Sequence, residues 1–255
     1  MGEITADDLA ALAVILPAAF VGAFAKGVTT IGLTLIAVPI IALFLDVQTA
    51  ILSLFLSKFL SDAVMLLEAK RTLAWRSALR LVAFIAAGAI AIPAATFVLA
   101  TAPGPWLNLF LGLSIFVFIA YQLLPRPVAI ASRHEATWGA VFGIAAGAAQ
   151  GLTGVSGPYS AMYLYGLHLG TAEFVFLSSV IYLLLDFSQL AAILYLDLYD
   201  PTRILYAVCA IAPVLAGTWL GIRVRAKLNG QAFRRALLVL LGLSGASLLV
   251  RGIFA

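Results

Sequence analysis

The stretch KGVTTIG, residues 26–32, lies in apolar sequence, and a similar stretch, QGLTGVSG, follows 124 positions later at residues 150–157. Glycines and polar residues are unusual at bilayer depth, where irregular backbone is tolerated only inside protein or around a cavity. A matched pair of such interruptions in two halves of a chain indicates the binding site of a duplicated transporter. The two glycine stretches therefore predict a duplicated membrane transport protein.

The composition independently favours a membrane protein. Of the 255 residues, 64% are hydrophobic and 10% are charged, whereas soluble domains carry about 25% charged residues. Long uncharged runs, such as residues 81–125, are typical of helical spans of about 20 residues and not of the alternating strands of a barrel. Because residues 1–8 are acidic rather than basic, we expect no removable signal peptide there.

The same counts exclude several kinds of function. A net charge of +4 comes from loop lysines and arginines, so nucleic acid is not expected as a partner. Cys209 is the only cysteine and there are two histidines, which argues against a metal site. We expect no cofactor and no catalytic residues, because the chain is predicted to be a transporter and not an enzyme.

The apolar segments predict an all-α polytopic membrane protein. Three segments are too short for a full span, which takes about 20 residues. We interpret the segment pairs around the glycine stretches as re-entrant or broken helix hairpins. The ten predicted segments are 9–26, 32–45, 47–68, 76–101, 104–124, 137–150, 158–168, 172–196, 202–224 and 232–253.

Charges along the chain predict that the two halves have inverted topology. Basic residues collect at 70–80, 125–135 and 223–235, and the positive-inside rule places all three loops in the cytoplasm. They share one side if each glycine stretch is the tip of a hairpin that returns to its starting side, and the same holds if both arms of each pair cross the membrane fully. The basic loop follows the third segment in the first half but the fourth in the second half, as inverted repeats require.

The predicted organisation is two inverted repeats, 1–125 and 136–255, joined by a basic cytoplasmic linker at 126–135. Each repeat comprises a hairpin and three transmembrane helices. The amino terminus is expected outside the cytoplasm, on the periplasmic face of the inner (plasma) membrane, with Asp46, Asp197 and Asp200. At the offset of 124, the matched positions are Lys26 with Gln150, Gly27 with Gly151, Thr29 with Thr153, Ile31 with Val155, Gly32 with Ser156, and Asp62 with Asp186.

The glycine stretches are the predicted substrate site. Helix amino termini bind anions through their N–H groups and partial positive charge. We expect Thr29–Gly32 to open one short helix and Thr153–Pro158 to open another, with Pro158 at the first helical position. Inverted symmetry would bring the two helix starts together near the midplane, with Thr30 close to Ser156. The candidate substrate-binding residues are Lys26, Gly27, Thr29, Thr30, Gly32, Gln150, Gly151, Thr153, Gly154, Ser156, Gly157 and Tyr159. The alternative is that the glycines only permit close helix packing.

Two of these residues have specific predicted roles. Lys26 would cost about 2.5–3.5 kcal/mol at mid-depth, so it holds the anionic substrate, pairs with a buried carboxylate or extends to an interface. Gln150 would orient the same ligand through its amide. Tyr159 is close enough in sequence to the second stretch to contact the ligand.

Four polar residues on other segments are candidates for coupling or gating. Lys58 and Asp62 lie four residues apart on one helix face, which favours an internal ion pair. Asp186 has no lysine nearby in its own helix, with Gln189 three residues later. A protonated Asp186 would make protons a candidate coupling ion; the alternative is contact with Lys26 or Lys58.

The motifs KGVTTIGLTLIAVP (26–39) and GIAAGAAQGLTGVSGP (143–158) resemble those of the sulfite exporter TauE/SafE family of permeases for sulfur-containing anions. The resemblance extends over the whole chain, although Thr30, Ser156 and Pro158 dilute the usual glycine triplets. It implies transport, with export as the expected direction, of sulfite, thiosulfate, sulfoacetate or a related sulfonate across the inner membrane. The expected partners are that small anion and the lipid bilayer, and both a monomer and a homo-oligomer are compatible with the sequence.

Two other functions compete with this interpretation. A passive anion channel would use the same site without coupling. An intramembrane serine hydrolase is suggested by Gly154-Val155-Ser156-Gly157, but a serine nucleophile needs a positioned base. The last histidine is His168, twelve residues further on in the same short segment, which disfavours the hydrolase.

Overall fold

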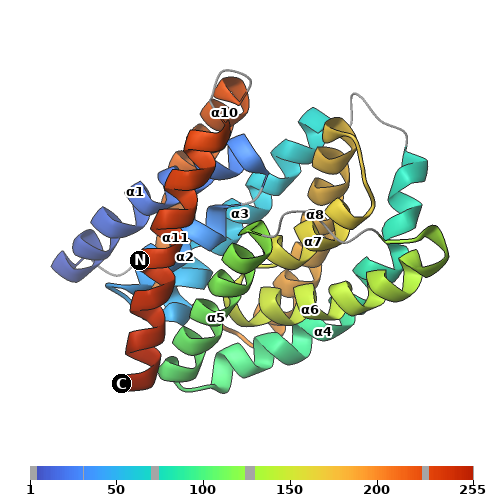
Figure 1. Cartoon of the computed structure of the whole chain (residues 1–255). Helices are drawn as coiled ribbons and strands as arrows, with labels where there is room; N and C mark the ends of the chain where they lie inside the picture. The colour runs from blue at the N-terminus through green and yellow to red at the C-terminus, as the bar shows by residue number, and fades with distance from the viewer. Residues whose placement is uncertain (1–4, 31, 70–74, 124–129, 226–229, 255) are drawn as a thin grey trace. The chain divides into compact units, whose positions relative to one another are not determined.

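The structure is a computed structural model that describes residues 5–30, 32–69, 75–123, 130–225 and 230–254, without the side chains of 75–77 and 230–237. These residues form helices and no strand (Figure 1). Ile31, Lys70, Arg71, Arg126 and Lys227 lie outside the described residues, as do the side chains of Arg76, Arg234 and Arg235. The helices are α1 (Ala6–Thr29), α2 (Leu33–Ala42), α3 (Val47–Ala69), η1 (Trp75–Leu81), α4 (Val82–Thr101), α5 (Gly104–Leu123), η2 (Ser132–His134), α6 (Glu135–Thr153), α7 (Gly157–Gly166), α8 (Thr171–Tyr195), α9 (Pro201–Cys209), α10 (Ile211–Val224) and α11 (Gly230–Phe254).

Helix lengths confirm an all-α polytopic membrane protein. In the described part of the chain, six helices are long and apolar enough to cross a membrane. Their bounds are Ala6–Thr29, Val47–Ala69, Ala78–Thr101, Gly104–Leu123, Thr171–Tyr195 and Pro201–Val224. By contrast, α2 and α7 have 10 residues each, or roughly 15 Å at 1.5 Å per residue. Both short segments were expected from the sequence.

The predicted segment 202–224 is interrupted at Ala210, between α9 and α10. Pro213 has no N–H to donate to the carbonyl of Cys209, four residues earlier. The backbone hydrogen bonds of the helix are therefore interrupted where α9 ends.

Helix boundaries repeat at the offset of 124 seen in the sequence. α1 ends at Thr29 and α6 at Thr153. α2 spans Leu33–Ala42 and α7 spans Gly157–Gly166, while α3 begins at Val47 and α8 at Thr171. The two hairpins thus have the same construction, and the inverted orientation of the halves stays a prediction.

The chain forms two compact units, and each contains helices from both predicted halves. One unit comprises Met1–Ser61, Ala102–Ile119 and Asp197–Ala255, and the other comprises Asp62–Thr101 and Ala120–Leu196. Contacts define these units, whereas sequence similarity defines the repeats 1–125 and 136–255. The repeat boundaries and the linker at 126–135 therefore stay predictions.

Glycines allow the closest helix pair within each unit. In one unit α4 runs along α6 (Figure 1), where a Cβ on Gly143 would lie 2.2 Å from the Phe84 carbonyl oxygen. In the other unit α1 packs on α10, where a Cβ on Gly221 would lie 2.3 Å from the Phe24 carbonyl oxygen. Small residues permit such approach of helix backbones in membranes.

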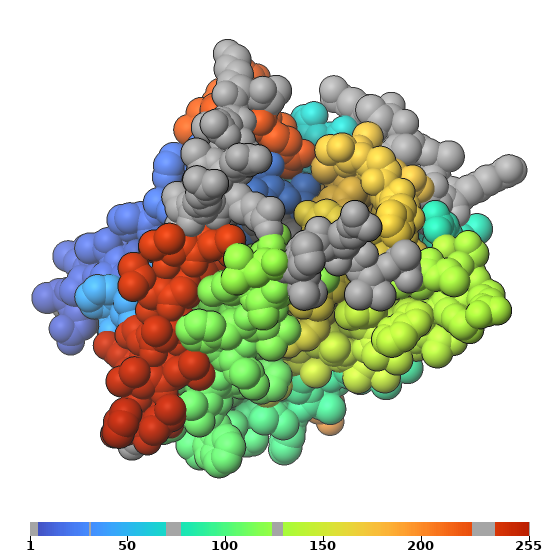
Figure 2. All heavy atoms as spheres, viewed as in Figure 1, coloured from blue at the N-terminus to red at the C-terminus, as the bar shows by residue number. Residues whose placement is uncertain are grey.

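In the unit that contains α1, a second close contact joins α5 and α11, which lie side by side in Figure 2. A Cβ on Gly112 would lie 2.9 Å from the Leu249 side chain, and one on Gly245 would lie 3.0 Å from Ile115. The small residues again define the line of contact.

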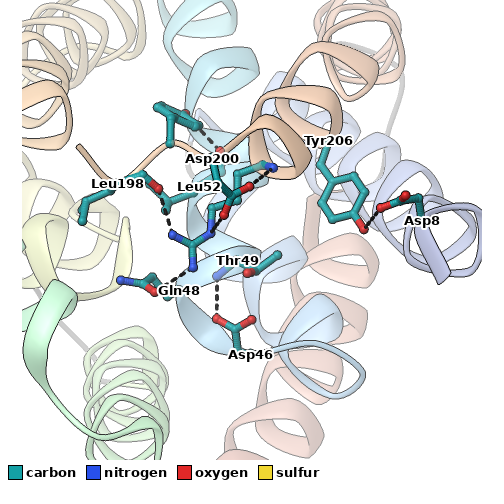
Figure 3. A network of polar contacts seen from close by, with 10 residues as sticks. Asp8, Asp46, Gln48, Thr49, Leu52, Leu198, Asp200 and Tyr206 are labelled. Carbon is teal, nitrogen blue, oxygen red and sulfur yellow. Dashed lines mark hydrogen bonds and ion pairs between the residues drawn. The ribbon is translucent and has the colours of Figure 1, made fainter. Parts of the chain in front are cut away.

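Polar residues gather at one end of the first unit, where the α2–α3 and α8–α9 connections meet the start of α1 (Figure 3). Tyr206 donates to Asp8 at 2.8 Å, and Asp46 and Asp200 accept from the backbone at the starts of α3 and α9. Asp46 and Asp200 are two of the three acidic residues that the sequence assigns to the outer face; the third, Asp197, lies three residues before Asp200.

Arg203 links the polar residues at this end of the unit, and replacing it is expected to lower the stability of the folded protein. Its guanidinium donates to the Leu198 carbonyl and to Gln48 Oε1, each at 2.8 Å, and lies 3.3 Å from Asp200. Hydrogen bonds to charged groups contribute about 1.5–3 kcal/mol, less where solvent screens them. We expect Arg203→Gln to lower the unfolding temperature of the detergent-solubilised protein, with a loss of about 1–2 kcal/mol. Arg133→Gln, at an exposed position, is the control; equal shifts in both variants would contradict the structural role of Arg203.

Candidate functional site

The first glycine stretch is a break between two helices. α1 ends at Thr29, and Thr30 adopts the left-handed conformation with φ 70°, donating its N–H to the Lys26 carbonyl at 2.7 Å. Gly32, with φ 150°, precedes α2, which begins at Leu33. The prediction that Thr29–Gly32 opens the short helix was therefore wrong, because Thr29 and Thr30 close the preceding helix.

The second stretch repeats this geometry. Gly154 has φ 69° and donates to the Gln150 carbonyl at 2.7 Å, so it corresponds to Thr30. Ser156 is the N-cap of α7 and Gly157 its first residue. Pro158 is consequently the second helical residue and not the first, and Thr153 ends the preceding helix.

The threonine hydroxyls are bonded to their own backbone. Thr29 donates to the Ala25 carbonyl at 2.9 Å and Thr153 to the Ala149 carbonyl at 2.8 Å, while Thr30 donates to the Thr29 carbonyl. These hydroxyl protons are thus used within the protein, and a role of the three threonines in binding the substrate stays a prediction. The donors suited to an anion are the first backbone N–H groups of α2 and α7, which have no acceptor within their own helix.

Just before each break, a glycine in the last turn of the preceding helix packs against the backbone of another helix. A Cβ on Gly27 would lie 2.5 Å from the Thr218 carbonyl oxygen and 2.9 Å from the Ile222 nitrogen. A Cβ on Gly151 would lie 2.7 Å from the Ile92 carbonyl oxygen and 2.9 Å from the nitrogen of Thr96. The contacted residues lie four apart in both cases, so the breaks rest on equivalent surfaces of α10 and α4.

Buried charges lie close to the first break in sequence and on α3. Lys26, in the last turn of α1, is 3% exposed. Lys58 and Asp62, one turn apart in α3, are 6% and 0% exposed. The ion pair predicted for Lys58 and Asp62, the role of Lys26 and the ligand contact of Tyr159 stay predictions.

Gln150, Asp186 and Gln189 form a buried network between α6 and α8. Gln150 Nε2 donates to Asp186 Oδ1 at 2.7 Å and to Gln189 Oε1 at 2.8 Å. Gln189 Nε2 donates to the Gln150 carbonyl at 2.9 Å. Both amide protons of Gln150 are thus used within the protein, whereas the sequence interpretation assigned this amide to the ligand.

Thr96 and Thr218, two residues beside the glycines, were not singled out in the sequence. Ser61 and Thr218 share a hydrogen bond of 2.8 Å between their hydroxyls. Thr96 Oγ1 and Gln150 Oε1 are buried and have no hydrogen-bond partner among the residues that the structure describes. A lone threonine in an apolar helix gives no sequence signal, and only the packing of α4 on α6 reveals Thr96.

The serine and histidine considered for catalysis, and the possible metal-binding side chains, are placed as follows. Ser156 and His168 lie at opposite ends of α7, and His168 is exposed. Within the described ranges, no group of three or more His, Cys, Asp or Glu side chains is placed to hold a metal ion.

Among the residues that the structure describes, six apolar helices long enough to cross a membrane and two equivalent broken hairpins with buried polar residues define a polytopic membrane protein. The family model of the sulfite exporter TauE/SafE matches residues 15–248 of the 255-residue chain. The chain therefore belongs to the sulfite exporter TauE/SafE family, a family of membrane transporters. No curated protein and no solved structure matches the chain significantly.

Proposed function

We propose that this protein exports a small sulfur-containing anion, such as sulfite or a sulfoacetate-like organosulfonate, across the inner membrane. The family match over residues 15–248 supports the transport class and the sulfur anion. The observation that best supports this binding site is the matched pair of breaks, because a short helix begins at each break within the buried part of the protein.

We assign substrate binding to the two breaks separately, through residues Lys26 to Gly32 and Gln150 to Gly157. Helix starts favour anions, and the oxyanions of sulfur can accept several N–H bonds at once. The threonine hydroxyls and the Gln150 amide would hold the backbone in shape and would not bind the anion directly.

The proposed orientation has the start of α1 in the periplasm. The acidic residues Asp8, Asp46 and Asp200 share one end of the first unit (Figure 3). In the second unit Arg80 binds Glu135 at 2.6 Å, so the residues that end two predicted cytoplasmic segments, 70–80 and 126–135, meet. Both observations support the positive-inside assignment.

Flux into proteoliposomes tests the substrate class. Purified protein should transport sulfite, thiosulfate or sulfoacetate with saturable kinetics, and acetate should be the poor substrate. A flux that rises linearly with concentration would favour the passive channel, and no transport of any of the sulfur anions would contradict the proposal.

Lys26 should strengthen anion binding by its charge. We expect Lys26→Gln to raise the apparent KM for the sulfur anion about tenfold or more, since about 1.4 kcal/mol of lost attraction is tenfold in affinity. Lys26→Arg, which keeps the charge, should retain more of the affinity than Lys26→Gln. Equal KM values for wild type and Lys26→Gln would reduce Lys26 to a structural residue.

A further inference from the structure

Arg225 follows the last residue of α10 and forms hydrogen bonds with the end of α1. Its Nε and Nη2 atoms both donate to the Gly27 carbonyl oxygen, at 3.0 and 2.7 Å. Gly27 lies in the last turn of α1, whose carbonyls have no N–H group further along the helix to accept from. The neighbouring Lys26 carbonyl accepts the N–H of Thr30. The side chain of Arg225 thus supplies a donor to a last-turn carbonyl that borders the break.

The contact has the features of a specific structural interaction. A positive charge is favoured at a helix C-terminus, and the arginine fork gives one acceptor two aligned donors. Partial burial lowers the pKa of Arg225, yet an arginine stays charged at neutral pH. The residue cannot be replaced by lysine without losing the fork.

The second break is fixed by a different residue. There Gln189 donates to the Gln150 carbonyl at 2.9 Å from inside the protein. The first break depends instead on an arginine from the 223–235 segment, which the sequence reading treats only as a topology signal. Gln150 occupies the position equivalent to Lys26 and not to Gly27, so the two breaks differ both in which last-turn carbonyl accepts from a side chain and in the side chain that donates.

We propose that Arg225 is a positioning residue that fixes the first break through the Gly27 carbonyl and so sets the affinity for the transported anion. The effect on affinity rests on the proposed function, whereas the effect on the geometry of the break does not. Arg225 acts through the backbone at Gly27 and is not itself assigned a contact with the substrate.

The first test measures how readily a thiol reagent reaches the first break, and it does not depend on transport activity. Val28→Cys in a Cys209→Ser background places the only thiol of the chain beside Gly27. Adding Arg225→Gln should raise the rate of labelling by a small thiol reagent about tenfold or more, the factor expected for losing a hydrogen-bonded charge. Arg225→Lys should give an intermediate rate and covers the case in which Arg225→Gln does not fold. Unchanged labelling in both variants would overturn the proposal.

Arg223 supplies the matched control, because it is basic, two residues away, and its guanidinium lies 4.1 Å from the centre of the Trp219 ring. Arg223→Gln should leave the labelling rate unchanged, and an equal increase there would also overturn the proposal.

The second test separates positioning from general stability. Arg225→Gln should raise the apparent KM for the sulfur anion about tenfold and change Vmax per folded protein much less, whereas a merely structural loss would lower Vmax and leave KM unchanged. If labelling accelerates but wild type transports no sulfur anion, the fixing of the break stands and the proposed function fails. If Vmax falls with KM unchanged, the positioning role is overturned.

Discussion

Gly27→Ala and Gly151→Ala are each expected to reduce transport per folded protein on the order of 100-fold, the loss that a misplacement of about 1 Å causes at a catalytic site. The added Cβ would lie 2.5 Å from the Thr218 carbonyl oxygen in the first variant and 2.7 Å from the Ile92 carbonyl oxygen in the second. Backbone atoms cannot rotate away as a flexible side chain can, so the helix that carries the break must shift. Overpacking of this kind also destabilises by about 1–3 kcal/mol.

Two other glycines provide the controls for this prediction. At Gly104 and Gly170 no described atom lies within 4 Å of an added Cβ. Gly104→Ala and Gly170→Ala should therefore keep wild-type flux and unfolding temperature. If Gly27→Ala and Gly151→Ala transported as well as these controls, close backbone approach would not be what the breaks require. Flux in proteoliposomes, normalised to the folded protein, is the measurement.

The helix pattern was largely predictable because the length of an apolar run determines whether a helix can span the bilayer. The short segments predicted at 32–45 and 158–168 correspond to α2 at Leu33–Ala42 and α7 at Gly157–Gly166. The interruption at Ala210 was not predicted, because the sequence stays apolar on both sides of it. The helix is interrupted only because Pro213 lacks the N–H that would bond to the Cys209 carbonyl.

The geometry of the breaks was harder to predict than their location. A left-handed residue is usually glycine, so Thr30 gave no sign that it would close α1. Its counterpart at the same offset is Gly154, and that correspondence contains the missing signal. Once Thr30 and Gly154 are matched, both are recognisable as C-caps, and the short helices must begin three residues later.

Side-chain partners depend on packing that the sequence does not encode locally. Gln150 and Asp186 are 36 positions apart, and Arg225 lies 198 positions from Gly27. Lys58 and Asp62 were paired by helix periodicity alone. Periodicity identifies neighbours within a helix, whereas contacts of Gln150 and Arg225 require the α6–α8 and α1–α10 packing.

Asp186→Asn is expected to abolish the stimulation of transport by a proton gradient while leaving the fold intact. In the buried network, Asp186 Oδ1 accepts a hydrogen bond from Gln150 Nε2 at 2.7 Å, and the amide oxygen of asparagine can accept the same bond. Of Gln150, Asp186 and Gln189, the substitution therefore changes the one that titrates and preserves its hydrogen bond to Gln150. Wild type should transport faster when protons flow with their gradient, and Asp186→Asn should transport at the rate without a gradient.

Two further variants separate coupling from structure. Asp186→Leu removes the acceptor as well, so a buried donor loses its partner and stability should fall by about 1–3 kcal/mol. Asp62→Asn changes the buried carboxylate at the equivalent position of α3, which has Lys58 one turn away. The ion pair predicted for Lys58 and Asp62 would keep Asp62 charged through the cycle, so Asp62→Asn should leave the response to the gradient in place. Loss of the response in Asp62→Asn would assign proton coupling to Asp62, and its persistence in Asp186→Asn would assign the coupling to a group other than Asp186.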